Sequence, residues 1–599
     1  MIRVCFVVRK WACRLATAHR SDRPRHWIDA VGPRVAIAWL MVAVAMCAVS
    51  GEADARDDAR PGALHILLAP RVDQGRVREV EIQLPLETPA ADDGDVLLEM
   101  PLLHAMAPSA LQDASALSAR DDAGPLALRV EHDPPDPSGF RQDRRWRAAR
   151  ATQGDVVVRY AATPREITPQ TPPGPLYDMR REREGFHGAG SIIIALPPEG
   201  WPRQVRIDWD LSSMTPGARG VSSLGEGPVR ATLPRRSVDT SFFMAGPLSS
   251  LPADGTGAFI GYWLTTPAFD LERALGRIEG AYREFARFFG DEAAPFKVFM
   301  RTTSRFAGGG TGGYSSFMFG HVENRQRDEG EVLGLLTHET LHNWLNSLGG
   351  ESNHWWSEGS TTYYTQILSY RAGLTTLDQF LDGMNALAEE YSTNPRSELP
   401  NDDVTQLFFS DHDAQLVPYQ RGSLYFAQLD ARIRTASGGT RRVDDLVVAM
   451  LEARRSGGDY SLQGWRDLLN GALGEAGVAN FEAMTAGRPL DLPENLLGPC
   501  FEREAMFHRR FQPGFRVGQD GRVTGLSPDA AGAKAGIRDG DRLTHPQALK
   551  ALEAAGPGVA RLELVRGDEA ITVTIEPWGD ARPGYRWMRN DTPEARCDI

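Results

Sequence analysis

One stretch, residues 330–366, constrains this 599-residue chain more than any other. Apolar residues recur at helical spacing over residues 330–348, and a Gly-Gly pair follows. We therefore predict a helix over 330–348 that the two glycines end. His338 and His342 are four residues apart, which places both imidazoles on one face of that helix.

The pattern His338-Glu339-x-x-His342 predicts a metal centre. Two imidazoles on one helix face can share one Zn²⁺, and Glu339 beside them can take a proton from a water held there. A third protein ligand is needed. Glu358 is the candidate, because it opens a second helical pattern and only fifteen residues separate it from His342.

Two side chains outside this pattern leave more than one role open. His354 is a candidate fourth ligand, or it lines the cleft or packs beside Trp355; a catalytic zinc keeps one position open for water, which favours the last two. Tyr419 opens a helical pattern in Val417-Pro-Tyr-Gln-Arg-Gly422. A tyrosine there is most often a cap-region aromatic, but a hydroxyl that faces the metal can stabilise a tetrahedral oxyanion.

The run Gly308-Gly-Gly-Thr-Gly-Gly-Tyr-Ser-Ser316 lacks the Lys-Ser/Thr ending of a P-loop. It is either a flexible loop or an exposed strand edge whose backbone pairs with an extended peptide near the zinc. On the second interpretation the substrate-binding residues are Gly310, Thr311, Gly312, Gly313 and Tyr314.

Length and periodicity predict several domains. Hydrophobic residues make up 42% and charged residues 24%, as in globular proteins. Residues 56–250 predict an antiparallel β-sandwich-like domain, with strands at 64–68, 80–84, 155–160, 192–196 and 205–209. Residues 251–499 predict a mostly helical domain, with a helix ending at Gly290, a strand at 296–300, and helices near 376–391, 417–435, 441–456 and 461–474.

The C-terminal part predicts a small β-rich module at residues 500–585 and a tail at 586–599. The pattern S-P-x-A…A-G-I-x-x-G-D over residues 527–541 is typical of PDZ domains, which bind extended C-terminal peptides by strand addition. Cys500 and Cys597 are the two cysteines beyond residue 55. We predict a disulfide between them in preference to two free thiols.

The first 55 residues predict an export signal. Eight Lys and Arg residues accompany an apolar run at 35–49, and Ala53-Asp-Ala55 resembles a cleavage site. We therefore expect an exported, periplasmic protein, with an N-terminal membrane anchor as the alternative if the signal is retained. Removing these residues deletes eight basic and four acidic groups and takes the net charge from −13 to −17, which argues against a nucleic-acid partner.

Together these motifs resemble the glycyl aminopeptidase family of zinc metallopeptidases, in the clan of aminopeptidase N and leukotriene-A hydrolase. The resemblance covers about residues 60–580. It rests on Phe289-Gly290, the glycine run at 308–313, His338-Glu339-x-x-His342 with Trp344, Trp356-x-Glu358-Gly359-x-Thr-x-Tyr-Tyr364, Arg371-Ala-Gly-Leu374, Tyr419-x-x-Gly422 and Phe481 with Gly487. It implies a multidomain α+β fold with an N-terminal β domain, a thermolysin-like catalytic domain and a C-terminal PDZ domain.

The resemblance also implies roles for individual residues. His338, His342 and Glu358 would hold one Zn²⁺ per chain, Glu339 would be the general base, and Tyr419 would match the clan's oxyanion tyrosine. The implied activity is aminopeptidase-like hydrolysis of peptides or proteins.

Two alternatives to this activity stay open. In the wider clan the glycine-run strand supplies an acidic residue for the substrate's α-amine, whereas Gly312-Gly313 stand here and the next carboxylate is Glu323. An endopeptidase therefore remains an alternative. A non-catalytic or narrow-substrate scaffold that binds peptides through its PDZ domain is another; zinc content and the effect of Glu339→Gln distinguish it from an enzyme.

Overall fold

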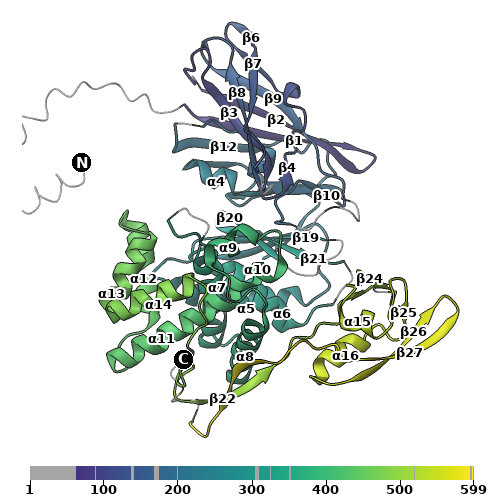
Figure 1. Cartoon of the computed structure of the whole chain (residues 1–599). Helices are drawn as coiled ribbons and strands as arrows, with labels where there is room; N and C mark the ends of the chain where they lie inside the picture. The colour runs from purple at the N-terminus through teal and green to yellow at the C-terminus, as the bar shows by residue number, and fades with distance from the viewer. Residues whose placement is uncertain are drawn as a thin grey trace, which may run out of the picture. The chain divides into compact units, whose positions relative to one another are not determined.

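A computed structural model describes residues 62–87, 89–136, 140–167, 171, 174–198, 200–303, 309–323, 326–349, 353–518, 520–593, 597 and 599. The expected export signal lies outside these residues. Residues 61–599 group into one unit, which is multidomain α+β in architecture (Figure 1). Within the described residues, no helix combines the length and the apolar character that crossing a membrane requires.

Three sheets dominate the N-terminal part of this unit. The largest has the order β15-β12-β1-β2-β9-β5-β6 and comprises β1 (Leu64–Asp73), β2 (Arg76–Leu86), β5 (Ser118–Asp121), β6 (Gly124–Leu126), β9 (Val156–Ala162), β12 (Arg203–Trp209) and β15 (Val229–Leu233). Leu64, Ile66 and Leu68 alternate along β1 and are fully buried, as expected for a strand with one face in a core. Strand β1 pairs antiparallel with β2 but parallel with β12, so the domain is not purely antiparallel.

Two smaller sheets complete this part. One has the order β4-β3-β8-β7, from β3 (Val96–His104), β4 (Ala107–Pro108), β7 (Leu128–His132) and β8 (Arg141–Ala148). The other has the order β10-β11-β16-β13-β14, from β10 (Arg180–Glu182), β11 (Gly185–Ala189), β13 (Arg219–Ser222), β14 (Gly225–Glu226) and β16 (Phe242–Gly246). Short helices η1 (Ala114–Ala116), α3 (Gly190–Ile193) and α4 (Arg235–Asp239) connect the strands.

Four of the five expected N-terminal strands are confirmed, and the one at 192–196 is wrong. Its first two residues end helix α3. Ile192, Ile193 and Ile194 are all buried, so this apolar run is one turn of buried helix followed by extended chain. A short apolar run does not distinguish a buried helical turn from a buried strand.

A five-stranded sheet begins the central part of the unit, residues 249–485. Its order is β17-β18-β19-β21-β20, from β17 (Ser249–Leu251), β18 (Phe259–Trp263), β19 (Phe296–Thr302), β20 (Gly310–Gly313) and β21 (Ser316–His321). Helix α5 (Leu271–Phe288) links the parallel strands β18 and β19 and buries its apolar face. The predicted end of this helix at Gly290 is confirmed within one turn: Phe289 is the C-cap and Gly290 adopts φ 64°.

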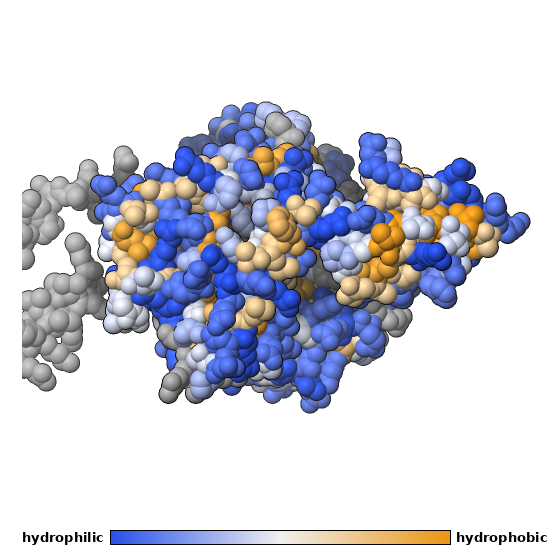
Figure 2. All heavy atoms as spheres, turned by 60° about the horizontal axis from the view of Figure 1, so that its bottom comes forward, coloured by the Kyte–Doolittle hydropathy of each residue, from blue (hydrophilic) through white to orange (hydrophobic). Residues whose placement is uncertain are grey.

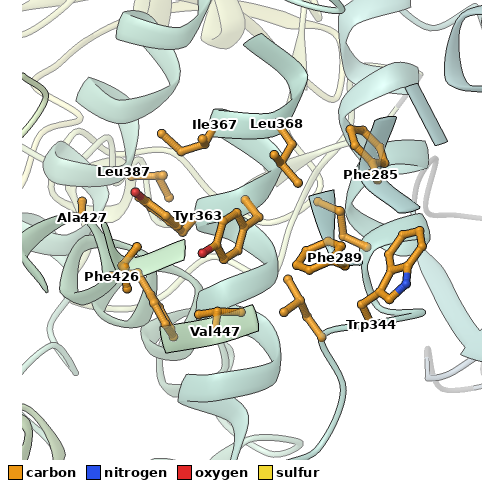
Figure 3. Close-up of a cluster of buried hydrophobic side chains, with 14 of the residues drawn as sticks. Phe285, Phe289, Trp344, Tyr363, Ile367, Leu368, Leu387, Phe426, Ala427 and Val447 are labelled. Atoms are coloured by element: carbon orange, nitrogen blue, oxygen red, sulfur yellow. The ribbon is translucent and has the colours of Figure 1, made fainter. Parts of the chain in front are cut away.

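Helices form the rest of this central part. They are α6 (Glu329–Leu341), α7 (His354–Arg371), α8 (Leu377–Thr393), α9 (Asn401–Leu407), α10 (His412–Val417), the π-helical turn η2 (Pro418–Gly422), α11 (Ser423–Ser437), α12 (Val443–Ser456), α13 (Leu462–Leu473) and α14 (Glu475–Thr485). The predicted scaffold helices are thus present. Figure 3 shows their core, in which Tyr363, Ile367 and Leu368 of α7 lie among side chains from α5, α8, α11 and α12.

The predicted helix over 330–348 is too long. Helix α6 ends at Leu341, with His342 as its C-cap, rather than at the Gly-Gly pair. Beyond it the backbone N–H of Trp344 bonds to the Leu341 carbonyl, and the Trp344 indole donates to Asp291 at 2.9 Å. This anchoring turns the chain off the helix axis. Leu345 and Leu348, which follow this turn, are buried although they lie outside the helix. Their burial explains why the apolar spacing resembled a continued helix.

The C-terminal part consists of a two-stranded ribbon and a small module. Strands β22 (Phe501–His508) and β28 (Arg582–Arg589) pair antiparallel along their whole length, and Trp587 of β28 joins the core of the central helices. The boundary that we placed after residue 585 therefore falls inside β28. The predicted disulfide between Cys500 and Cys597 is present, with 5.3 Å between the Cα atoms.

The module between the ribbon strands has a core of its own. It contains β23 (Arg516–Val517), β24 (Val523–Thr524), α15 (Ala531–Lys534), β25 (Arg542–Leu543), α16 (Ala548–Ala555), β26 (Ala560–Arg566) and β27 (Glu569–Ile575). Val523, Leu562 and Leu564 lie at the centre of the core and are almost completely buried.

Candidate active site

Three side chains converge at the junction of α6 and α7. Nε2 of His338 and Nε2 of His342 lie 3.2 Å apart, and Oε2 of Glu358 lies 3.3 Å from each. Their side chains are only 15–18% exposed. Among the described residues this is the group of His, Cys, Asp and Glu side chains placed to hold a metal ion.

The arrangement fits Zn²⁺. Tetrahedral zinc with bonds of about 2.0–2.1 Å needs ligand atoms about 3.3 Å apart. The three separations agree with that spacing. Moreover, Oε2 of Glu358 is buried and makes no hydrogen bond of good geometry within the described structure, as expected of an atom reserved for a cation. Three protein ligands leave a fourth position for water or substrate.

The second nitrogen of His342 is fixed by its surroundings. Its Nδ1 lies 3.1 Å from the carbonyl oxygen of Leu345 and 3.3 Å from Oγ1 of Thr361. The carbonyl makes Nδ1 the protonated nitrogen and leaves Nε2 free to bind metal. The early end of α6 makes this possible, because the turn after Leu341 brings the Leu345 carbonyl back toward the ring.

Without a metal, His342 and Glu358 shift each other's pKa. Burial lowers the pKa of His342, but the charge of the Glu358 carboxylate, 3.3 Å from the ring nitrogen, outweighs burial and raises that pKa to about 9. Burial alone would raise the pKa of Glu358, yet the two imidazoles hold it well below its usual value. A bound cation therefore takes the place of a proton at His342.

Glu339 lies on the sheet side of the metal ligands. It is 8% exposed, and burial raises its pKa above the usual 4.5, although the neighbouring imidazoles and the Gly310 N–H oppose the shift. Its carboxylate packs directly on β20: a Cβ added to Gly310 would lie 2.2 Å from the Glu339 Cδ atom. Glycine is thus required at 310 for the carboxylate to occupy this place.

Tyr419 lies beside the candidate metal ligand His338. It is part of η2, and its ring stacks on His338 with 5.8 Å between centroids and 22° between planes. Burial, and then the charges of Glu358 and Glu339, raise the pKa of Tyr419 well above 10. The phenol therefore keeps its proton at neutral pH and can donate a hydrogen bond.

The glycine-rich strand β20 is an edge strand, as one of the two interpretations predicted. It pairs with β21 alone, and the Gly309 carbonyl accepts from Gly320 in that pairing. Alternation then directs the peptide groups of Gly310 and Gly312 away from β21. A Cβ added to Gly312 would meet nothing within 4 Å, so the space beside this residue is open.

The other predicted substrate-binding residues are engaged by the N-terminal part. Oγ1 of Thr311 accepts from the Leu176 N–H at 2.8 Å. The N–H of Tyr314 bonds to the Thr240 carbonyl, and a Cβ on Gly313 would lie 2.7 Å from the same oxygen. In the predicted set, the Gly310 carbonyl and the Gly312 N–H are therefore the backbone groups that can face a ligand, because the Gly310 N–H bonds to Glu339 and the Gly312 carbonyl accepts from the Tyr177 hydroxyl.

Tyr177 was missed by the sequence reasoning. Its hydroxyl donates to the Gly312 carbonyl at 3.2 Å, and its pKa is raised to about 12 by burial and then by Glu339, which places it beside the site. The residue comes from a proline-rich segment more than 130 positions upstream of β20. No local pattern signals this contact, because it depends on how the N-terminal part packs against the sheet.

His354 does not join the metal group. Its ring stacks on Phe408 with 3.8 Å between centroids and 9° between planes, and Phe409 packs on both Phe408 and Phe140. Four residues before Glu358 on α7, His354 lies on the same helix face as the ligand. It thus lines the site within an aromatic series, and Trp355 packs elsewhere, against Phe426.

Comparison with known proteins agrees with this geometry. A family model described as M61 glycyl aminopeptidase matches residues 345–405, which include Glu358 and the whole of α7. The crystal structure of an aminopeptidase N family protein from Idiomarina loihiensis superposes with a TM-score of 0.64 at 15% identity, covering 89% of this chain and 99% of that chain. At this identity the match establishes the fold.

Two other solved structures are more distant. An M1 zinc metallopeptidase from Deinococcus radiodurans, a mutant bound to a Tyr-Ser-Ala substrate, gives a TM-score of 0.45 at 17% identity over 72% of this chain and 95% of that chain. Native yeast LTA4 hydrolase gives a TM-score of 0.44 at 13% identity, covering 74% of this chain and 71% of that chain. The comparison with curated proteins gave no match. The family match and the His338–His342–Glu358 cluster together support an aminopeptidase-like zinc peptidase.

Proposed function

We propose that this protein is a zinc-dependent peptidase that holds one Zn²⁺ per chain on His338, His342 and Glu358. The observation that carries the proposal is the convergence of three buried ligand atoms, 3.2–3.3 Å apart, beside a carboxylate that is not a ligand. Bound zinc supplies a Lewis acid and lowers the pKa of a coordinated water.

The chain's own residues supply the proton transfer and the charge stabilisation. Glu339 accepts a proton from the attacking water and can return it to the leaving amine, for which its raised pKa is suited. Tyr419, protonated at neutral pH, donates a hydrogen bond to the oxygen that becomes negative in the tetrahedral state. The outward-facing carbonyl of Gly310 and N–H of Gly312 pair with an extended substrate backbone, while the Gly310 N–H holds Glu339 and the Gly312 carbonyl accepts from Tyr177.

The mode of cleavage depends on what holds the substrate's amino end. An aminopeptidase needs an anion near the amino side of the scissile bond, and Gly312 offers open space there instead. Glu323, the next carboxylate along the sequence, forms an ion pair with Arg183. The aminopeptidase-like fold favours exopeptidase action, whereas the open space beside Gly312 favours endopeptidase action as the second candidate.

The C-terminal module is proposed to be a PDZ domain that binds an extended C-terminal peptide. Helix α16 contributes Leu549 and Leu552, which pack against the module's core while remaining partly exposed, and β23 contributes Val517 in the same way. Figure 2 shows apolar residues gathered on the module at the right of the view. We also propose that the protein is exported, since residues 1–55 have the composition of a signal.

The test compares one set of peptides with free and with acetylated N-termini. Residues 56–599 are purified as wild type and as Glu339→Gln, zinc is measured in both, and products are identified by mass spectrometry. Cleavage restricted to free N-termini establishes an aminopeptidase, and equal cleavage of acetylated peptides establishes an endopeptidase; in either case Glu339→Gln reduces kcat about 100- to 10,000-fold. A zinc-loaded wild type that cleaves neither set contradicts the proposal and favours a binding scaffold.

A further inference from the structure

The position of Tyr419 depends on an irregular element. The turn η2, Pro418–Gly422, has π-helical geometry and lies between α10 and α11. A π-helical turn accommodates an extra residue and so changes which side chains face a neighbouring helix; such turns are frequent at functional sites. What fixes this turn against α7 therefore determines where the phenol of Tyr419 lies.

The turn touches α7 through two glycines. A Cβ added to Gly359 would lie 2.6 Å from the Gly422 Cα atom, and a Cβ added to Gly422 would lie 2.7 Å from the Gly359 Cα atom and 2.8 Å from the Trp355 carbonyl oxygen. Neither glycine has a positive φ, so each is required for space rather than for conformation. The two backbones cross in direct contact.

This crossing is adjacent to both halves of the site. Gly359 follows the metal ligand Glu358, and Gly422 comes three residues after Tyr419. The contact thus joins, through main chain alone, the helix that carries a ligand and the turn that carries the phenol. No flexible side chain lies between the two backbones to absorb a change.

The opposite side of the turn is anchored as well. Nδ2 of Asn394 donates to Oε1 of Gln420 at 2.8 Å and to the carbonyl of Asp413 at 2.9 Å. Arg421 is 1% exposed and donates to the carbonyls of Ser397 and Leu399. The turn is therefore held between α7 on one side and the segment after α8 on the other.

We infer that the Gly359–Gly422 contact is the positioning element that sets Tyr419 against the metal ligands. Carbon atoms pack at about 3.5–4.0 Å, so a methyl group at either glycine separates the backbones by about 1 Å. A displacement of that size in a catalytic group can cost about 100-fold in rate. The inference rests on the proposed function for its catalytic consequence but not for its geometry.

The experiment uses Gly422→Ala and Gly359→Ala in the full mature chain, with Tyr419→Phe as reference. Gly276→Ala is the matched control, because Gly276 is an exposed glycine of α5 whose added Cβ would meet nothing within 4 Å. Zinc content, thermal unfolding, kcat and KM are measured for each. We expect both alanine variants at the crossing to keep zinc and to lose about 100-fold in kcat with little change in KM, and the control to match the wild type.

A double-variant comparison shows whether the glycine acts through the phenol. In the Tyr419→Phe background, Gly422→Ala should lower kcat by a much smaller factor than it does in the wild type, because the hydroxyl that it displaces is already gone. An equal reduction of kcat in the two backgrounds would overturn the inference. A crystal structure of Gly422→Ala provides a readout without activity: the 5.8 Å separation of the His338 and Tyr419 rings should increase, and an unchanged separation would contradict the proposal.

Asn394→Ala covers the case in which the alanine variants do not fold. It loosens the rear anchor of the turn without adding atoms, and it should lower kcat while zinc is retained. A folded Asn394→Ala protein with wild-type kcat would count against the inference. Failure of the proposed function has a different signature, since the wild type would then cleave no peptide while the ring separation still responded to Gly422→Ala.

Discussion

Nε2 of His342 lies 3.3 Å from Oε2 of Glu358, although fifteen residues separate the two in the sequence. Helix α6 stops at Leu341 and α7 starts at His354, and the beginning of α7 packs against the end of α6. This packing brings a carboxylate to two imidazoles, and the proposed chemistry depends on it.

The surroundings of His342 predict a measurable effect on metal affinity. Thr361→Val keeps the shape of the side chain but removes the hydroxyl that lies 3.3 Å from Nδ1. Loss of a group that orients a ligand typically weakens metal binding about 10- to 100-fold, and because the Leu345 carbonyl remains we expect the lower end. Competition with a chelator measures the affinity. His354→Ala is the control and should bind zinc as the wild type does; weaker binding there would make His354 a ligand.

A buried ion pair predicts a large loss of stability where the N-terminal part meets the sheet. Arg301 of β19 is 0% exposed, and its guanidinium bonds to Oδ1 of Asp178 at 2.8 Å and to the Asp178 carbonyl at 3.1 Å. Asp178→Ala leaves this charge buried with one partner fewer, which should lower the free energy of unfolding by about 3–5 kcal/mol. Urea unfolding measures it. Glu166→Ala, at an exposed pair with Arg181, should change stability by less than about 1 kcal/mol.

His104 predicts a dependence of stability on pH. Burial, and then the charge of Arg141, lower the pKa of His104 to about 4, from about 6.5 in the unfolded chain. Between those values the unfolded chain binds a proton that the folded protein does not. Stability should therefore fall as the pH drops from about 6.5 to 4, by on the order of 2–3 kcal/mol.

The measurement for His104 is a comparison of unfolding curves at pH 7 and pH 5. The variant His104→Asn should show a smaller loss of stability than the wild type over this interval. Because other buried histidines titrate in both proteins, the difference between them isolates His104. An identical pH dependence in the two proteins would show that this ring is not the group responsible.

We predict that the disulfide stabilises the attachment of the C-terminal ribbon, β22 and β28, to the rest of the protein. Cys500 and Cys597 close a loop of 97 positions, for which removal of the bridge costs about 2–5 kcal/mol. The double variant Cys500→Ser/Cys597→Ser should unfold at lower temperature and expose β28 to proteases earlier than the wild type. Addition of a reductant should lower the unfolding temperature of the wild type to the same extent and leave that of the variant unchanged. Equal unfolding temperatures for both proteins, with and without reductant, would contradict a structural role of the disulfide.

The candidate ligands were predictable because they are encoded locally. His338 and His342 belong to one short pattern at the end of α6, Glu358 belongs to another near the start of α7, and helical spacing places the two imidazoles on one face. The edge position of β20 was one of two interpretations that the run of glycines left open, the other being a flexible loop. The length of α6 was not predictable, since it depends on the bond between Trp344 and Asp291.

Contacts between segments that are distant in the sequence could not be predicted from local sequence patterns. Tyr177 reaches Gly312 from the N-terminal part of the unit, and the buried run around Ile193 folds as a helical turn because of its surroundings. The crossing of Gly359 and Gly422 likewise unites two motifs that were visible separately. The sequence showed each glycine as part of a motif without indicating why glycine is needed there. The structure shows that the close contact of the two backbones requires it.

The central claim is tested most directly by removing and restoring the metal. Hydrolysis of one defined peptide is followed with purified protein, with protein depleted by a chelator, and with depleted protein titrated with Zn²⁺, while Glu358→Gln is treated identically. Activity should disappear with the metal and return to its full value at about one zinc per chain, and Glu358→Gln should recover little. Full activity in the depleted protein, or recovery by Glu358→Gln equal to that of the wild type, would contradict it.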